Sequence, residues 1–146
     1  MYNVHWTHSL HCFEFVELTL DLYNDFENYI NHRNNTSTTR KEDLTHRFYT
    51  LMMDNYREHK EVIFYADKLH VSSKYLSEVV KETSGKSPKD WIIDYSLLEI
   101  KELLKNSSLN IQEITIRTKF LNQSALGRFF KRHTNMSPSE YRESTY

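Results

Sequence analysis

Residues 124–141 read SALGRFFKRHTNMSPSEY, and residues 74–91 read KYLSEVVKETSGKSPKDW. The two stretches align at an offset of 50 residues: a Leu, two adjacent apolar residues and a Lys are followed by Ser-Pro and an aromatic ring. Upstream, Tyr65-Ala66 aligns with Ile114-Thr115 at an offset of 49, so the second copy carries one extra residue in its turn. The chain therefore contains two copies of one unit: a short helix, a tight turn, a longer helix and then a Ser-Pro pair that begins the next helix.

Apolar spacing and capping residues predict the helices around this repeat. A helix ahead of the first copy is predicted by a stripe of Leu44, Phe48, Leu51 or Met52, and Tyr56. A polar residue with an acid three positions later predicts helix starts at Ser87, Asn110 and Ser137. The remaining helices are expected over 62–69, 73–83, 88–104, 111–118, 123–133 and a short stretch after Ser137. In the long helix, the residues expected to face inward are Ile93, Leu97, Ile100 and Leu104.

The composition supports an all-α fold. Only 2 Gly and 2 Pro occur in 146 residues, where average usage of roughly 7% and 5% would give about 10 and about 7. An all-β fold needs many tight turns, and a disordered Pro/Gly-rich chain shows the opposite bias. The single Cys excludes a disulfide scaffold and zinc sites of the Cys₄ or Cys₂His₂ type. Because no apolar run approaches about 18 residues and the N-terminus lacks a signal pattern, we expect a cytoplasmic protein without membrane contact.

Charge is distributed unevenly along the chain, although its formal net value is only -1. Residues 1–46 hold three bases and seven acids, a net of −4, whereas residues 47–146 hold 16 bases and 13 acids, a net of +3. Within 117–142, six Lys or Arg residues stand against a single acid, Glu140. An acidic start thus masks a basic end, which favours a polyanion-facing surface in the C-terminal part.

A short helix, a turn of three to four residues and a second helix form a helix-turn-helix, whose second helix lies in the major groove of DNA. The side chains expected to fix the crossing of the two helices are Ala66, Val71 and Leu76, then Thr115, Phe120 and Leu126. Those expected to reach base edges are Lys74, Ser77 and Glu78 in the first copy and Gln123, Ser124 and Arg128 in the second. Arg pairs with guanine, Gln pairs with adenine, and Glu accepts from cytosine. Phosphate contacts are expected from Ser72, Lys81, Lys86, Asn122 and Lys131.

The long helix between the copies sets a length scale. Its 17 predicted residues, Pro88 to Leu104, span roughly 25 Å at about 1.5 Å per residue. Two recognition helices one DNA turn apart need roughly 34 Å, which such a helix approaches once helix widths are added. One chain is therefore expected to contact two successive major grooves without dimerising.

Residues from about 46 to 143 resemble the DNA-binding domain of AraC/XylS-type transcriptional regulators, a homeodomain-like fold with two helix-turn-helix units joined by a long linker helix. The matching segments are FYADKL at 64–69, SKYLS at 73–77, SGKSP at 84–88 with Trp91, LEIKELL at 98–104 and, most specifically, FFKRHTNMSPSEYR at 129–142. The resemblance covers about two-thirds of the chain. It implies a sequence-specific transcription regulator, usually an activator that contacts RNA polymerase beside its DNA site.

The domain organisation follows from this match. An N-terminal appendage and linker, 1–45, is expected before the DNA-binding domain, 46–146, whose helix-turn-helix units lie at about 62–83 and 111–133. The polar segment 34–43 is the predicted linker.

The appendage is short for the sensor and dimerisation domain that such regulators normally carry. Residues 13–18 are interpreted as a strand followed by a helix over 19–31, or as the start of a single helix over 13–30. The appendage is therefore either a remnant of that domain's last strand and dimer helix or part of a longer protein. Its apolar face predicts a homodimer through residues 13–32.

The chain departs from the pattern of the family at several positions, most of them in the second copy. The family favours a small residue at Thr115, Gly near Lys119 and at Asn135, aromatic residues at Ala125 and Leu126, and Arg at Tyr95. Lys119 is expected to adopt a positive φ at some steric cost. Loss of the aromatic residues is expected to thin the core, so the second copy is expected to bind DNA more weakly or with another specificity.

The sequence gives less support to functions other than DNA binding. His5, His8 and His11 with Cys12 have a spacing that would align metal ligands on a helix, but an ordinary polar terminus is the favoured interpretation and no metal is predicted. No catalytic constellation or phosphate cradle occurs, so neither an enzyme nor a cofactor is predicted. The serious alternative to a DNA-binding regulator is a truncated regulator that pairs with full-length relatives through residues 13–32 and antagonises them.

Overall fold

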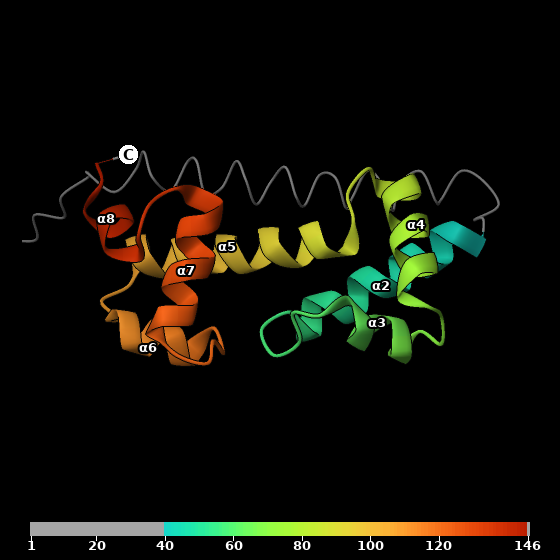
Figure 1. The fold of residues 1–146 in the computed structure, drawn as a ribbon, viewed down its shortest axis with the longest axis horizontal. Coiled ribbons are helices and arrows are strands. Elements are labelled where there is room, and N and C mark those ends of the chain that lie inside the picture. The colour runs from blue at the N-terminus through green and yellow to red at the C-terminus, as the bar shows by residue number, and fades with distance from the viewer. Residues whose placement is uncertain (1–39, 146) are drawn as a thin grey trace, which may run out of the picture. The chain divides into compact units, whose positions relative to one another are not determined.

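The computed structural model describes residues 40–145 (Figure 1). This part of the chain contains no strand and forms α2 (Arg40–Asn55), α3 (Val62–Lys68), α4 (Ser73–Ser84), α5 (Pro88–Asn106), α6 (Ile111–Arg117), α7 (Gln123–Thr134) and α8 (Pro138–Glu143). The all-α prediction is confirmed. The described residues form two compact units, which we call the N-terminal unit (40–97) and the C-terminal unit (98–145). In the described range, no helix is long and apolar enough to cross a bilayer.

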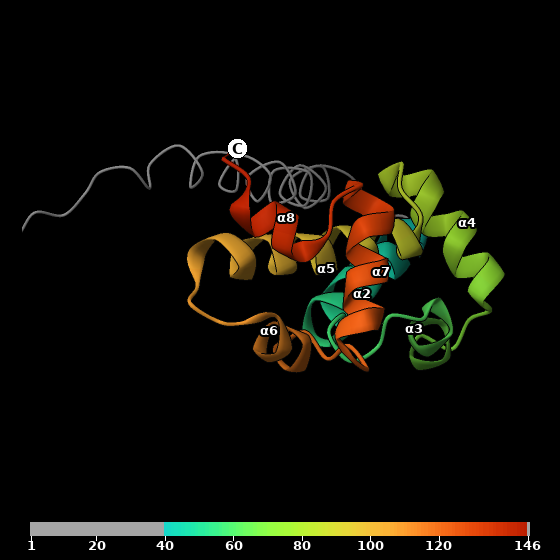
Figure 2. The ribbon, with the colours of Figure 1, turned by 60° about the vertical axis from the view of Figure 1, so that its left-hand side comes forward.

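The N-terminal unit packs α2 against α3 and α4 (Figures 1 and 2). The fully buried rings of Phe48 and Tyr65 meet edge to face, with centroids 5.5 Å apart. On the α4 side, the hydroxyls of Thr45 and Thr83 are hydrogen-bonded at 2.7 Å. The other buried residues that join the three helices are Leu44, Met52, Ala66, Leu76, Val79 and Val80. Of the stripe predicted for the first helix, Leu44, Phe48 and Met52 are buried, whereas Leu51 and Tyr56 are only half-buried.

In the C-terminal unit, α7 packs against α6 and α8. Leu126 and Phe130 of α7 are fully buried, and the Phe130 ring meets Tyr141 of α8 at 5.3 Å. Arg142 holds α8 in place by donating hydrogen bonds to the carbonyls of Leu104 and Leu109. Leu126, for which an inward position is predicted, and Phe130 therefore face the core, whereas the neighbouring Phe129 is only half-buried.

The repeat is visible in the helix boundaries. Helices α3 and α6 have equal lengths, and so do α4 and α7. The connection between the paired helices has four residues, 69–72, in the N-terminal unit and five, 118–122, in the C-terminal unit. The predicted extra residue of the second turn is thus confirmed. It is Leu121, because Val71 and Phe120 donate equivalent backbone hydrogen bonds and the next equivalent pair is the N-caps Ser72 and Asn122.

Both turns contain a non-glycine residue in the left-handed region. Lys119 has a φ of 57°, which confirms the prediction made for it, and His70 occupies the equivalent place with a φ of 56°. A side chain at such a φ is strained relative to glycine. The tight turns are therefore held by the packing of the helices on either side.

The predicted helix starts are confirmed by their hydrogen bonds. The Asn110 side chain accepts from the Glu113 amide at 2.9 Å while the Glu113 carboxylate accepts from the Asn110 amide, and Ser137 and Glu140 form the same reciprocal pair. At the start of α5, Ser87 and Asp90 exchange the equivalent bonds. Each pair satisfies amides that the helix itself leaves unpaired.

Two predictions about helix boundaries and faces are wrong. The predicted linker extends to Asp43, but α2 already begins at Arg40. Two acidic residues in its first turn, Glu42 and Asp43, stabilise the helix start by their attraction to the positive end of the helix dipole. In addition, the Lys41 ammonium pairs with the Glu82 carboxylate of α4 at 2.7 Å. The acids of the first turn and the contact with α4 thus act together at the start of the helix, and only the second of these is absent from the local sequence.

The inward face of α5 also differs from the prediction. Ile100 and Leu104 are buried, but Ile93 and Leu97 are only half-buried, and Trp91, Ile92 and Ser96 are buried instead. The first half of α5 belongs to the N-terminal unit and the second half to the C-terminal unit, so its two halves serve different cores. Ser96 tolerates burial because its hydroxyl donates to the Ile92 carbonyl at 2.8 Å.

Several predictions concern residues 1–39, which lie outside the described residues. They are the strand and helix over 13–31, the dimer surface over 13–32, most of the linker, and the group of His5, His8, His11 and Cys12. These remain predictions.

Candidate nucleic-acid interface

The exposed face of α7 carries the residues predicted to contact bases in the second copy. Gln123, Ser124 and Arg128 are all exposed, and Leu126 and Phe130 on the same helix are fully buried. The Asn122 side chain caps the helix by accepting from the Ala125 amide at 2.8 Å. The first turn of α7 is therefore fixed in place while its polar side chains point to solvent, as a recognition helix requires.

In the N-terminal unit, α4 has the same construction. Lys74 and Glu78 are exposed and Ser77 is half-buried. Ser72 caps the helix by accepting from the Tyr75 amide at 3.1 Å. The structure therefore brings the three predicted base contacts of this copy to the outer side of one helix, with Ser77 the least accessible.

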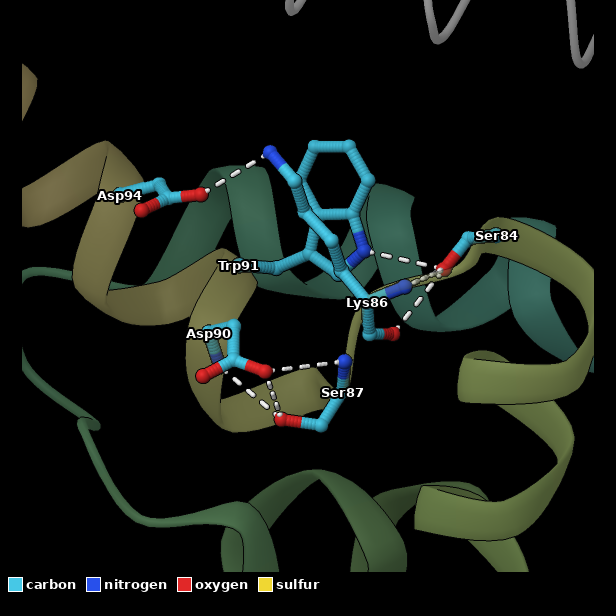
Figure 3. A network of polar contacts seen from close by, with 6 residues as sticks. All are labelled: Ser84, Lys86, Ser87, Asp90, Trp91 and Asp94. Atoms are coloured by element: carbon cyan, nitrogen blue, oxygen red, sulfur yellow. Dashed lines mark hydrogen bonds and ion pairs between the residues drawn. The ribbon is translucent and has the colours of Figure 1, made fainter.

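Four of the five predicted phosphate contacts are exposed, namely Ser72, Lys81, Asn122 and Lys131. Lys86 is placed differently. Its ammonium lies 3.2 Å from an Asp94 carboxylate oxygen and 4.9 Å from the centre of the Trp91 ring (Figure 3). The structure thus uses the Lys86 side chain within the N-terminal unit, at the corner between α4 and α5.

The corner around Lys86 holds α4 in position (Figure 3). The Ser84 hydroxyl donates to the Val80 carbonyl at 2.6 Å and accepts from the indole nitrogen of Trp91 at 3.1 Å. Gly85 follows with a φ of 78°, a conformation that favours glycine. The recognition helix of the N-terminal unit is therefore locked to α5 at its C-terminal end.

The C-terminal unit builds its corner without glycine. Asn135 takes the place of Gly85 with a φ of 61°, and Thr134 donates to the Phe130 carbonyl at 2.8 Å. Asn is the residue that, after Gly, best tolerates this backbone conformation.

The cap of α8 follows this corner. Hydrogen bonds from the Ser137 backbone amide and hydroxyl hold the pKa of the Glu140 carboxyl below its usual value.

The two recognition helices differ in charge. Helix α7 carries Arg128, Lys131 and Arg132 and no acid, a net of +3, whereas in α4 the two Lys residues are balanced by Glu78 and Glu82. Over the described residues, the C-terminal unit holds eight bases and five acids, and the N-terminal unit holds ten of each. The basic surface predicted from the charge distribution is therefore concentrated on one helix of one unit.

A contact that the sequence analysis did not predict joins α6 to α7. The Gln123 amide nitrogen donates to the side-chain oxygen of Gln112 at 2.6 Å. Gln112 is the second residue of α6 and carries no capping or apolar signal, so no local pattern singles it out. The two residues are close in sequence, but their spacing indicates a contact only once the geometry of the turn is known.

A model of a family described as a helix-turn-helix domain matches residues 65–144, more than half of the chain. The match includes both recognition helices and α5 between them. The chain belongs to the AraC-type helix-turn-helix family. The resemblance noted from the sequence motifs is thereby confirmed.

Individual AraC-type proteins agree with this assignment. The HTH-type transcriptional regulator YobQ of Bacillus subtilis is 32% identical over 77 residues, which cover 53% of this chain and 32% of that protein. The chain spans about a third of the length of the curated relatives it matches. Among solved structures, the C-terminal domain of AraT, a response regulator from Geobacillus stearothermophilus, has a TM-score of 0.64 at 25% identity and covers 74% of this chain and 93% of its own.

The DNA-binding domain of AdpA, solved in complex with a target DNA, has the same fold. Its TM-score is 0.59 at 23% identity, over 67% of this chain and 88% of that domain. The double helix-turn-helix architecture of the AraC type is therefore shown both by the family match and by the fold of the chain.

Proposed function

We propose that the protein binds double-stranded DNA in a sequence-specific manner and regulates transcription. The observation that carries this proposal is the outer face of α7, where Gln123, Ser124 and Arg128 are exposed on a helix of net charge +3. Arg and Gln side chains recognise guanine and adenine in the major groove, and the positive charge attracts phosphates. The names of the relatives, which are transcriptional regulators, support the same function and favour it over the antagonist.

We infer that α4 and α7 enter two separate major-groove segments. Base contacts are assigned to Lys74, Ser77 and Glu78 on α4 and to the three residues of α7. Phosphate contacts are assigned to Ser72, Lys81, Asn122 and Lys131. Lys86 is also proposed as a phosphate contact. Because its ammonium is already paired with the Asp94 carboxylate, a DNA phosphate would have to compete with Asp94 for it.

Selection from random duplexes, followed by a salt-titrated binding assay, tests the function. We expect a selected sequence to bind with a dissociation constant of about 10 nM or tighter and with a steep dependence on salt concentration. Guanine methylation interference is expected to show two patches about one helical turn apart. Absence of measurable DNA affinity contradicts the proposal, and a single patch contradicts the use of both helices.

Two partners are proposed on the sequence features alone. The resemblance implies contact with RNA polymerase beside the DNA site, as expected of an activator. The apolar residues within 13–32 imply a homodimer. Light scattering at high protein concentration tests the dimer, and a monomer there contradicts it.

A further inference from the structure

The hydrogen bond between Gln112 and Gln123 links the first turn of α6 to the first turn of α7. The two atoms that it joins are 2.6 Å apart, and both side chains are exposed to solvent. Water competes well for such exposed groups, so this bond adds little to folding. Its position is more informative: Gln123 is the first residue of the recognition helix and one of the proposed base contacts.

The chemistry of the Gln123 amide determines what this bond does. The amide nitrogen carries two hydrogens, and one of them is donated to Gln112. The other hydrogen and the amide oxygen remain as one donor and one acceptor. This pair matches the major-groove edge of adenine, where N7 accepts and the N6 amino group donates.

Gln112 favours one order of that donor and acceptor. In the structure its oxygen faces the Gln123 nitrogen, so turning the Gln123 amide alone would place two oxygens against each other and lose the hydrogen bond. The reverse order requires both amides to turn together. A freely rotating amide must instead be ordered when DNA binds. Because this ordering costs conformational entropy, it weakens both the binding and the preference for adenine.

The equivalent positions of the N-terminal unit provide an internal comparison. The repeat places Ile63 at the position of Gln112 and Ser73 at the position of Gln123. Ile63 is 61% exposed and has no amide to offer. The paired amides are thus a property of the C-terminal unit and are not required by the helix-turn-helix backbone.

We propose that Gln112 is a positioning residue for DNA recognition: it holds the Gln123 amide in the orientation that selects adenine. This inference rests on the proposed function and deepens it, since it names a base and a second residue for the α7 site. Gln112 acts through Gln123 and needs no contact of its own with a base.

The test uses the full chain and its selected DNA duplex, in which the adenine contacted by Gln123 is located first with the variant Gln123→Ala. Replacing that adenine by 7-deazaadenine removes N7, and replacing it by purine removes the N6 amino group. We expect each replacement to weaken binding of the wild type about tenfold. A loss of affinity with both modified bases identifies the bidentate contact.

Three variants then separate positioning from other roles. Gln112→Leu removes the acceptor and is expected to lower the preference for adenine over the other bases at that one position by about two- to threefold, as befits the loss of an exposed hydrogen bond. Gln112→Glu keeps an acceptor for the Gln123 amide, so it is expected to retain the preference while its negative charge weakens binding to every sequence. Ile63→Ala is the matched control at the equivalent exposed position and is expected to leave the preference unchanged.

The outcomes are distinguishable. If the wild type binds no DNA, the proposed function fails and this inference fails with it. If the wild type binds specifically but Gln112→Leu keeps the full adenine preference, or loses no sensitivity to the two modified bases, the positioning role of Gln112 is wrong while the function stands. Thermal unfolding of each variant is expected to match the wild type, because Gln112 and Ile63 are exposed.

Discussion

At equivalent positions of the two recognition helices, α4 carries Glu78 and Glu82 where α7 carries Arg128 and Arg132. Both helices start at a side-chain cap, end in a left-handed residue and bury a Leu at the same place. The Glu82 carboxylate serves the fold, since it pairs with the Lys41 ammonium of α2. The contrast between the exposed Glu78 and Arg128 is the part of the charge difference that bears on what each unit meets outside the protein.

The charge difference also bears on the relative strength of the two units. The departures from the family pattern led to the expectation that the C-terminal unit binds DNA more weakly or with another specificity. Sequence-independent affinity, however, depends mainly on the number of phosphates that a surface neutralises. We therefore expect the C-terminal unit to supply most of the general affinity, and the N-terminal unit to contribute mainly through selectivity.

The largest expected effects concern the two matched core positions. Leu76→Ala and Leu126→Ala each remove a fully buried side chain, and each is expected to lower the free energy of unfolding by about 2–5 kcal/mol. Urea denaturation measures the loss, and amide hydrogen exchange shows in which unit protection disappears. A loss below about 1 kcal/mol for Leu126→Ala alone would reveal a core in the C-terminal unit that is loose enough to collapse around the cavity.

The next effect compares Arg128 with its counterpart Glu78. Arg128→Ala is expected to weaken binding to the selected duplex by about 1–3 kcal/mol and to relax the preference at one base pair. Glu78→Ala is expected to relax preference at another position while strengthening binding to random DNA, because it removes a negative charge. Quantitative gel-shift titrations on selected and random duplexes measure both quantities. Equal behaviour of the two variants would mean that the proposed contrast between the helices is wrong.

A smaller effect is expected from the two matched lysines, Lys81 and Lys131. Each lysine→Ala variant removes one proposed phosphate contact, so binding is expected to weaken alike for all sequences, by about 1 kcal/mol at low salt. The slope of log K against log salt is expected to become shallower by about 0.9 for each lysine replaced. A variant that changes the base preference but leaves the slope unaltered would contradict the phosphate assignment.

The smallest effects are expected in the turns. Lys119→Gly and His70→Gly relieve a left-handed backbone at the same place of each unit and are each expected to raise the stability by up to about 1 kcal/mol. Asn135→Gly is the control, with a change near zero, since Asn tolerates this conformation. Thermal unfolding measures all three. Destabilisation by Lys119→Gly would show that the Lys119 side chain, rather than its backbone, holds the turn.

Sequence patterns predicted most of this architecture because the signals were local. The caps at Asn110 and Ser137 and the change of offset before Asn122 each depend on neighbours within a few residues. The start of α2 and the inward face of α5 depend on tertiary partners instead, such as Glu82 for Lys41, and were missed. For the same reason the exposed positions of the recognition helices could be predicted, whereas the contact between Gln112 and Gln123 could not: it forms across a turn whose shape neither residue determines.

The boundary between the two units inside α5 has a consequence for folding. Within the described residues, each unit is one continuous stretch of chain, so the contacts among those residues are local in sequence. During synthesis, the N-terminal unit is complete in sequence at Leu97, while residues 98–145 still require roughly 2–10 s at about 5–20 residues per second. In that interval the second half of α5 has left the peptidyl-transferase centre without the helices that bury Ile100 and Leu104. Burial of these two side chains therefore waits until α6, α7 and α8 have been made, so we expect the C-terminal unit to form last.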